Sequence, residues 1–278
     1  MSSLPASVTT IAIYLAYLIQ SDSSTSVLYS AYYSIKWEHE LNLYNSVYSY
    51  TFLNLILEGG VRILSKPTVK KEPITSDIIK AVLRKFKPDK LPNLRMCCLM
   101  LLGYTGVLRY NELVHIKANN LLLFSSHVEV VIESSKTDIY RQRNTIVIAR
   151  SNSEFCPVAI LEKYLKQVNI SLSSDEFIFR SLFYLKSKNV HMLSKTNTPL
   201  SCARARELLI NALSDVGLHK KKFGLHNLRS GGASQAAHNC IPERLLKSHG
   251  RWKSDIAKDG YIKESLNNKL LVSQNLHL

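Results

Sequence analysis

Six cationic and aromatic side chains between residues 109 and 261 could act together on one phosphate group. The six are Arg109, Lys136, His226, Arg229, Trp252 and Tyr261. Guanidinium and ammonium groups bind phosphate oxygens, an imidazole can transfer a proton, and a tyrosine hydroxyl can act as a nucleophile. The set therefore suits attack of a tyrosine on a DNA phosphodiester without a metal ion.

Each member also has an ordinary interpretation. Arg109 and Glu112 lie three residues apart in a predicted short helix, where such pairs are usually surface ion pairs. The alternative is an arginine that its own carboxylate aims at a phosphate. Lys136 lies in a turn and is by default a solvated lysine, but it could also protonate a leaving oxygen.

The C-terminal residues are equally ambiguous when taken singly. His226 and Arg229 share a predicted helical face, and the small residues that follow them permit close approach of a backbone. Trp252 would by default be buried, but its neighbourhood is polar and its indole N–H could donate to a phosphate. Tyr261 is one of fourteen tyrosines, and a phenol with a pKa of about 10 needs cationic surroundings to attack at neutral pH.

Other catalytic classes fit less well. The sequence contains no phosphate-binding G-x-x-x-x-G-K-[ST] loop and no H-E-x-x-H motif. His249 and His238 lack a third ligand at useful spacing, so we predict no metal site and no cofactor. The five cysteines form no C-x-x-C pair, which argues against a disulfide framework and favours a reducing compartment.

The charge of the chain is uneven along its length. The 278 residues include 36 Lys and Arg against 21 Asp and Glu, a net charge of +15. Residues 1–66 hold three basic and four acidic residues, a net charge of −1, so residues 67–278 carry +16. Such a charge also fits an ordinary basic protein, but here it accompanies the six candidate residues and favours a polyanionic partner.

The elements that must position these residues are mainly helices. Before residue 66, apolar spacing predicts three helices, the first after Ser7 as N-cap and the third from residue 49 to 57, with its end near Gly59. The apolar run 8–19 is too short to span a bilayer, and we expect an intracellular protein. Residues 66–73 read as a proline-punctuated linker.

After the linker, the apolar residues follow helical spacing, then strand-like spacing between residues 128 and 148, and then helical spacing again. Strands are predicted over residues 128–132 and 145–148, on either side of a polar, basic hairpin turn. A helix is expected to start near Pro242, and Thr105 is a possible cap of the helix that carries Arg109. The other helices are predicted over residues 75–86, 94–102, 107–116, 157–168, 201–216 and 226–238. The fold class is therefore mainly α with a small antiparallel β-sheet.

In order and spacing, the six residues resemble the active site of the tyrosine recombinases, the phage-integrase family. Residues 105–113 match the motif Thr-Gly-x-Leu-Arg-x-x-Glu-Leu, and residues 226–229 match the H-x-L-R box. Trp252 stands where family members hold His or Trp, and a Tyr-Ile pair begins at Tyr261. Residues 247–261, together with 14–18, 35–37 and 70–74, are similar to recombinases of eukaryotic mobile elements of the Crypton and DIRS-type classes, and the resemblance covers nearly the whole chain.

The resemblance implies a C-shaped clamp of two domains around duplex DNA. It implies a helical, SAM-like core-binding domain over residues 1–66, a linker over 67–74 and a catalytic domain over 75–278. Family members usually carry a further helix before the core-binding domain, so the sequence fits a domain shortened at its N-terminus. A eukaryotic mobile element would place the protein in the nucleus.

The resemblance also implies roles. Tyr261 attacks and forms a 3′-phosphotyrosyl link, Arg109 and Arg229 bind the scissile phosphate, Lys136 protonates the 5′-oxygen, and His226 is a general acid/base. Trp252 is a phosphate ligand and Glu112 supports the arginines. Neither metal nor ATP is needed, and four protomers on two duplexes exchange C-terminal segments. Further DNA contacts are expected from Lys36, Arg62, Lys66, Lys70, Lys71, Arg141, Arg143, His249 and Arg251.

Three hypotheses remain open. The first is a site-specific recombinase or integrase that serves DNA integration or transposition. The second is a type IB topoisomerase-like strand transferase, which would use the same site but normally needs no tetramer. The third is a catalytically silent, domesticated DNA-binding protein, against which the intact set of six residues argues.

Overall fold

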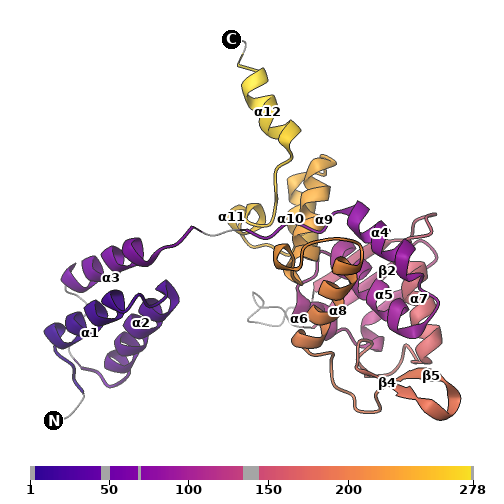
Figure 1. The fold of residues 1–278 in the computed structure, drawn as a ribbon, viewed down its shortest axis with the longest axis horizontal. Coiled ribbons are helices and arrows are strands. Elements are labelled where there is room, and N and C mark those ends of the chain that lie inside the picture. Colours follow the sequence, from indigo (N-terminus) through magenta and orange to yellow (C-terminus); the bar gives the residue numbers. More distant parts are fainter. Residues whose placement is uncertain (1–3, 45–50, 68–69, 134–143, 277–278) are drawn as a thin grey trace. The chain divides into compact units, whose positions relative to one another are not determined.

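The computed structural model describes residues 4–44, 51–67, 70–133 and 144–276 (Figure 1). The chain divides into two compact units, residues 1–70 and 71–278. The first is purely helical in its described residues, and the second combines helices with two small sheets. No helix in the described ranges is both long enough and apolar enough to cross a membrane.

The first unit packs three helices around one apolar core. They are α1 (Val8–Gln20), α2 (Thr25–Leu41) and α3 (Thr51–Leu64). The hydroxyl of Ser7 accepts the backbone N–H of Thr10, which confirms the predicted N-cap of α1. The prediction that α3 ends near Gly59 is wrong. The helix continues to Leu64, and a Cβ on Gly60 would lie 2.5–2.9 Å from side-chain atoms of Ile19 and Leu28, so glycine at this position permits close packing of the helices.

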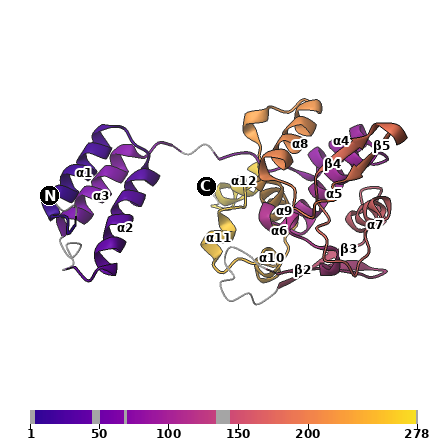
Figure 2. The ribbon, with the colours of Figure 1, turned by 90° about the horizontal axis from the view of Figure 1, so that it is seen from below.

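The second unit is built around one buried helix. Helix α5 (Leu91–Thr105) is buried along almost its whole length and packs against α7 and α9 (Figure 2). The other helices are α4 (Ser76–Phe86), α6 (Tyr110–Val114), α7 (Pro157–Val168), α8 (Cys202–Asp215), α9 (His226–His238), α10 (Glu243–Gly250), α11 (Asp255–Asp259) and α12 (Leu266–Gln274). The predicted helices over 75–86, 157–168, 201–216 and 226–238 are confirmed to within one residue.

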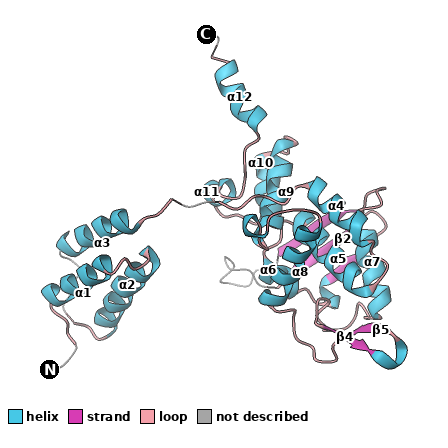
Figure 3. Ribbon diagram, viewed as in Figure 1, coloured by secondary structure: helices cyan, strands magenta, loops and turns pink. Residues whose placement is uncertain are grey.

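Two small antiparallel sheets complete the second unit (Figure 3). The first has the order β1 (Leu121–Leu123), β2 (His127–Ile132) and β3 (Asn144–Ala149), and its alternating buried residues face the core. The second is the hairpin of β4 (Leu182–Leu185) and β5 (Val190–Leu193). The expectation of a mainly helical fold with a small antiparallel sheet is confirmed.

Two adjacent glycines set the position of α9. A Cβ on Gly231 would lie 1.9 Å from the carbonyl oxygen of Ile74, and one on Gly232 would lie 2.2 Å from that of Tyr104. No side chain can be accommodated at these distances, so glycine is required at both positions. The close approach fixes the helix that carries His226 and Arg229 against the end of α5.

Candidate active site

The candidate site begins at the turn between α5 and α6. Val107 adopts a left-handed backbone conformation with φ of 46°, which is unfavourable for a β-branched residue. Arg109 is the N-cap of α6 rather than part of the helix, and its backbone N–H donates to Glu112 Oε2 at 2.8 Å. Thr105 does not cap α6, because its hydroxyl donates back to Leu101 O within α5.

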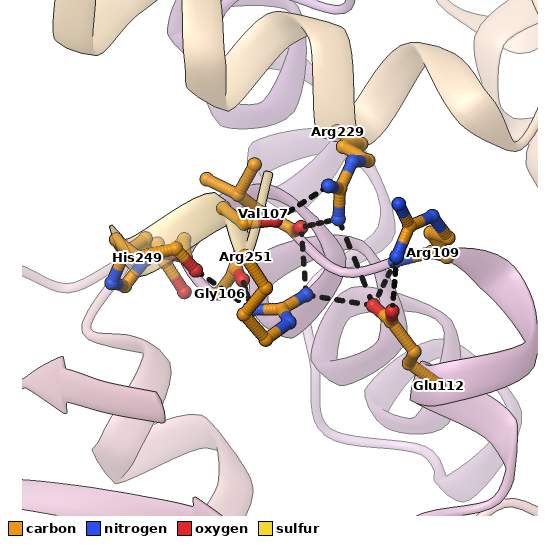
Figure 4. A network of polar contacts seen from close by, with 9 residues as sticks. Gly106, Val107, Arg109, Glu112, Arg229, His249 and Arg251 are labelled. Carbon is orange, nitrogen blue, oxygen red and sulfur yellow. Dashed lines mark hydrogen bonds and ion pairs between the residues drawn. The ribbon is translucent and has the colours of Figure 1, made fainter. Parts of the chain in front are cut away.

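Glu112 is the centre of a buried ionic cluster (Figure 4). Its side chain is 2% exposed, and Arg109 Nη1 donates to its Oε1 at 2.8 Å. Arg251 Nη2 donates to Oε2 at 2.7 Å, and Arg229 Nη1 lies 3.7 Å from the same oxygen. The interpretation of Arg109 and Glu112 as an ordinary surface pair does not hold for this carboxylate.

The environment keeps Glu112 ionised. Burial alone raises the pKa of the carboxyl, but the charge of Arg251 and the hydrogen bonds from Arg109 outweigh it. The net pKa lies below its usual range. One carboxylate therefore faces three guanidinium groups, and the cluster as a whole carries excess positive charge.

Arg229 is fully enclosed, with 0% of its side chain exposed. Its Nη1 donates to Val107 O at 2.5 Å and its Nη2 to Gly250 O at 2.6 Å. Burial, followed by the charge of Arg109, lowers the pKa of this guanidinium to about 10, so it stays charged at neutral pH. Although His226 lies only three residues away, its side chain is exposed at the start of α9.

Two aromatic rings cover Arg229. Its guanidinium carbon lies 4.6 Å from the ring centre of Trp252 and 4.9 Å from that of Tyr261, within the range of cation–π attraction. The two rings are 5.5 Å apart and tilted by 46°. Trp252 Nε1 is buried without a hydrogen-bond partner among the described residues. A Cβ on Gly250 would lie 1.9 Å from the Trp252 ring, so glycine is needed there.

The segment that carries Tyr261 is attached to its own unit. In α11, the buried Lys258 Nζ lies 2.8 Å from Glu243 Oε2 of α10. After the tyrosine, the backbone N–H of Lys263 donates to Ser234 Oγ of α9 at 2.9 Å. Sequence patterns gave no sign of Lys258, because a lysine on a short helix is usually solvated.

A cleft of about 930 Å³ lies next to the ionic cluster. Arg109 and His226 both line it, although they are 117 positions apart in the sequence. Lys71 and Arg206 line the same cleft. The sequence did not indicate that Arg206 lines the cleft, because an arginine on the polar face of a helix such as α8 is usually solvated.

The other basic residues fall into three groups. Lys136, Arg141 and Arg143 lie outside the described residues. In the first unit, Lys36, Arg62 and Lys66 are each within 4.0 Å of a carboxylate, at Glu40, Glu58 and Asp22. Lys70 is exposed, and Lys71 donates to Phe223 O.

Two of the residues expected to touch DNA, His249 and Arg251, are half-buried in the second unit. His249 Nε2 hydrogen-bonds Thr105 O at 2.8 Å, and the side chain of Arg251 is 6% exposed. Among the described residues, no group of three or more His, Cys, Asp or Glu side chains could hold a metal ion.

The lowered pKa of His249 leads us to expect that the free energy of unfolding depends on pH. Burial lowers its pKa, and the nearby charges of Arg251 and Arg229 lower it further, against the opposing effect of the Thr105 carbonyl. The unfolded chain then binds the proton more readily, so the stabilisation is complete above a pH of about 6.5 and decreases as the pH falls. We expect the free energy of unfolding to fall less between pH 7 and pH 5 in His249→Gln than in the unaltered protein. Identical profiles from urea titrations would contradict this.

The chain is similar to one curated protein and to several solved structures, whereas no family model matches it. It is 29% identical over 195 residues to an integrase/recombinase xerD homolog of Selenomonas ruminantium. The match covers 70% of this chain and 54% of the relative, so the chain spans about half the length of that protein.

Three solved structures share the fold. The XerH site-specific recombinase in a post-cleavage complex with palindromic difH substrate has a TM-score of 0.63 at 12% identity, over 98% of this chain and 71% of that one. A lambda integrase dimer bound to a COC′ core site scores 0.60 at 16% identity, over 95% and 82%. The Tn1549 transposon integrase in complex with circular intermediate DNA scores 0.60 at 11% identity, over 97% and 85%. The chain is therefore similar in sequence to the xerD homolog and shares its fold with these three recombinases and integrases.

Proposed function

We propose that this protein is a tyrosine-type DNA strand transferase, a site-specific recombinase or integrase. The observation that carries the proposal is that Arg229 shares the buried carboxylate of Glu112 with Arg109 while it lies beneath the rings of Trp252 and Tyr261. A candidate nucleophile and two cations suited to phosphate oxygens thus occupy one site.

In the proposed reaction, the hydroxyl of Tyr261 attacks the phosphorus of a DNA phosphodiester. A tyrosine–phosphorus bond forms, the bond to the 5′-oxygen breaks, and a 3′-phosphotyrosyl link and a free 5′-hydroxyl result. Arg109 and Arg229 stabilise the charge that develops on the phosphate oxygens. Lys136 gives a proton to the 5′-oxygen, and His226, on the cleft with Arg109, takes the proton of the attacking hydroxyl.

The aromatic cover over Arg229 implies a rearrangement before the reaction. A guanidinium with no exposed surface cannot contact a phosphate until the ring of Tyr261 moves aside. The same movement would give the unpaired N–H of Trp252 access to a phosphate oxygen. An unsatisfied buried donor costs about 1–3 kcal/mol, so a phosphate that accepts this hydrogen bond is favoured.

Double-stranded DNA is the proposed partner. Among the proteins of similar fold, XerH is described bound to difH substrate, lambda integrase bound to a COC′ core site, and the Tn1549 integrase in complex with circular intermediate DNA. In this chain, the net charge of +16 after residue 66 supports the same partner. We further propose that residues 1–66 form a core-binding domain that, with a linker over 67–74 and a catalytic domain over 75–278, closes around the duplex as a clamp.

The C-terminal helix supports assembly of several copies. None of the residues of α12 is buried, and Leu266, Leu271 and Val272 are more than half exposed. A nine-residue helix with apolar side chains in water gains little stability by itself. We propose that it packs on a second copy within a tetramer on two duplexes, and lambda integrase is described as a tetramer on a Holliday junction.

Covalent capture of DNA tests the proposed function. The substrate is a pool of randomised duplexes, each nicked so that the short strand with the released 5′-hydroxyl diffuses away. We expect an SDS-resistant protein–DNA adduct that forms equally in excess EDTA, because guanidinium groups supply the positive charge at the phosphate. Strict dependence of the adduct on a divalent metal would contradict the mechanism, and sequencing of the captured DNA would identify the target.

Adduct formation, together with relaxation of supercoiled DNA and the oligomeric state on DNA, separates the alternatives. A type IB topoisomerase-like enzyme would form the adduct as a monomer and relax supercoiled DNA without pairing two duplexes. A silent DNA-binding protein would bind the pool and form no adduct. Origin in a eukaryotic mobile element of the Crypton or DIRS-type classes rests on the sequence resemblance alone.

A further inference from the structure

Arg251 is held in an unusual conformation at the end of α10. It has a φ of 56°, in the left-handed region that few residues other than glycine adopt readily. Its Nη1 donates to His249 O at 2.7 Å, and its Nη2 donates to Glu112 Oε2 at 2.7 Å and to Val107 O at 3.2 Å. A backbone conformation of this cost persists only where its surroundings enforce it.

Arg251 and Arg229 bind the same strained turn. Both donate to the carbonyl oxygen of Val107, whose own backbone is left-handed (Figure 4). This turn leads directly into Arg109, which lies two residues further along the chain. The position of the Arg109 side chain therefore depends on contacts from α9 and from the C-terminal end of α10.

The charges give Arg251 a second effect. Glu112 Oε2 accepts hydrogen bonds from Arg251 and from the backbone of Arg109, while Arg229 remains 3.7 Å away. Without Arg251, the buried carboxylate would be satisfied chiefly by Arg109 and Arg229. These two side chains would then be drawn towards Glu112, and less of their charge would be available to a phosphate.

We propose that Arg251 is a positioning residue that neutralises Glu112 and thereby leaves Arg109 and Arg229 free to bind the scissile phosphate. This inference rests on the proposed function and adds a third arginine to it. Arg251 touches the carboxylate and the turn, and it need not touch DNA. Its removal should therefore slow cleavage much more than it weakens binding.

The test compares Arg251→Gln with Arg251→Lys in single-turnover cleavage of the captured duplex, at saturating protein. Glutamine and lysine tolerate the left-handed backbone at position 251 about as well as arginine does. Of the two, only lysine keeps the positive charge. We expect Arg251→Gln to cleave about 100-fold more slowly, as for a misplaced catalytic group. Arg251→Lys should recover most of the rate, and the Kd for DNA should stay within about threefold in both. Arg244→Gln, on the exposed face of the same helix, is the matched control.

A double variant isolates the charge effect. In a Glu112→Gln background, Arg251→Gln should slow cleavage by only about tenfold or less, because no carboxylate remains to be neutralised and only the contacts with the turn are lost. If Arg251→Gln alone fails to fold, recovery of folding in the double variant supports the charge pairing. Failure of both to fold would overturn it in favour of a purely structural role.

Two further outcomes would overturn the inference. Equal rates in Arg251→Gln and the unaltered protein would remove the positioning role while the proposed function stands. A large loss of DNA affinity with an unchanged rate would make Arg251 a DNA contact. Absence of any adduct with the unaltered protein would instead refute the proposed function itself, and the inference would fall with it.

Discussion

Tyr261→Phe should abolish the covalent adduct and leave DNA binding almost unchanged. The substitution removes only the hydroxyl, which is the proposed nucleophile. The ring that lies 4.9 Å from Arg229 and 5.5 Å from Trp252 remains, so the packing of the cluster should persist. The measurement is adduct formation on the nicked duplex pool, with the Kd for DNA determined on the same preparation.

Tyr184→Phe provides the matched control for this substitution. Tyr184 is an exposed tyrosine in the β4–β5 hairpin, where its hydroxyl hydrogen-bonds Asn189. The control should form the adduct at the normal rate. If Tyr261→Phe still forms an adduct, another tyrosine must be the nucleophile. Tyr110 is a poor substitute, because its hydroxyl is buried and donates to Leu200 O.

Arg229→Lys should reduce the cleavage rate about 10²–10³-fold, the usual loss when one donor to a developing oxyanion is removed. Lysine keeps the positive charge but cannot bind two phosphate oxygens through a planar fork. It also cannot reproduce the two hydrogen bonds to Val107 O and Gly250 O. The rate is measured in a single turnover at saturating protein, so that weaker binding does not contribute.

Arg229→Lys alters a buried side chain, so it is also expected to lower the stability of the fold. Arg95→Lys controls for this effect, because Arg95 is 3% exposed and donates to the carbonyl of Arg180 outside the candidate site. Both variants should lower the melting temperature, but only Arg229→Lys should slow cleavage. Equal slowing in the two variants would attribute the effect to general destabilisation.

Helices with a strong apolar stripe could be predicted from the sequence, whereas short or exposed elements could not. Helices α4 and α7 bury one face, so their apolar residues recur at helical spacing. The strands β4 and β5 expose most of their residues, and α12 buries none of its residues. The apolar residues of these three elements therefore show no clear helical or alternating spacing. Gly60 showed a different limit, since a glycine that usually ends a helix here permits close packing within one.

The residue types of the candidate site could be predicted, but their environments could not. The motif around Arg109 indicated a pair with Glu112, and the structure places that pair at the centre of a buried cluster. Arg251 joins it from a position 139 residues away in sequence, through a left-handed backbone conformation that no local pattern indicates. Burial of this kind depends on tertiary packing, which a spacing rule does not contain.

The ion pairs of the first unit have a consequence for how that unit could recognise DNA. Lys36, Arg62 and Lys66 already face carboxylates of their own unit. Exposed pairs of this kind are weak, so each cation can turn to a phosphate, but its carboxylate then stays close to the DNA and repels it, which reduces the electrostatic gain. Contacts made by this unit would therefore depend on shape and hydrogen bonding, and they would persist at ionic strengths that weaken the strongly basic remainder of the chain.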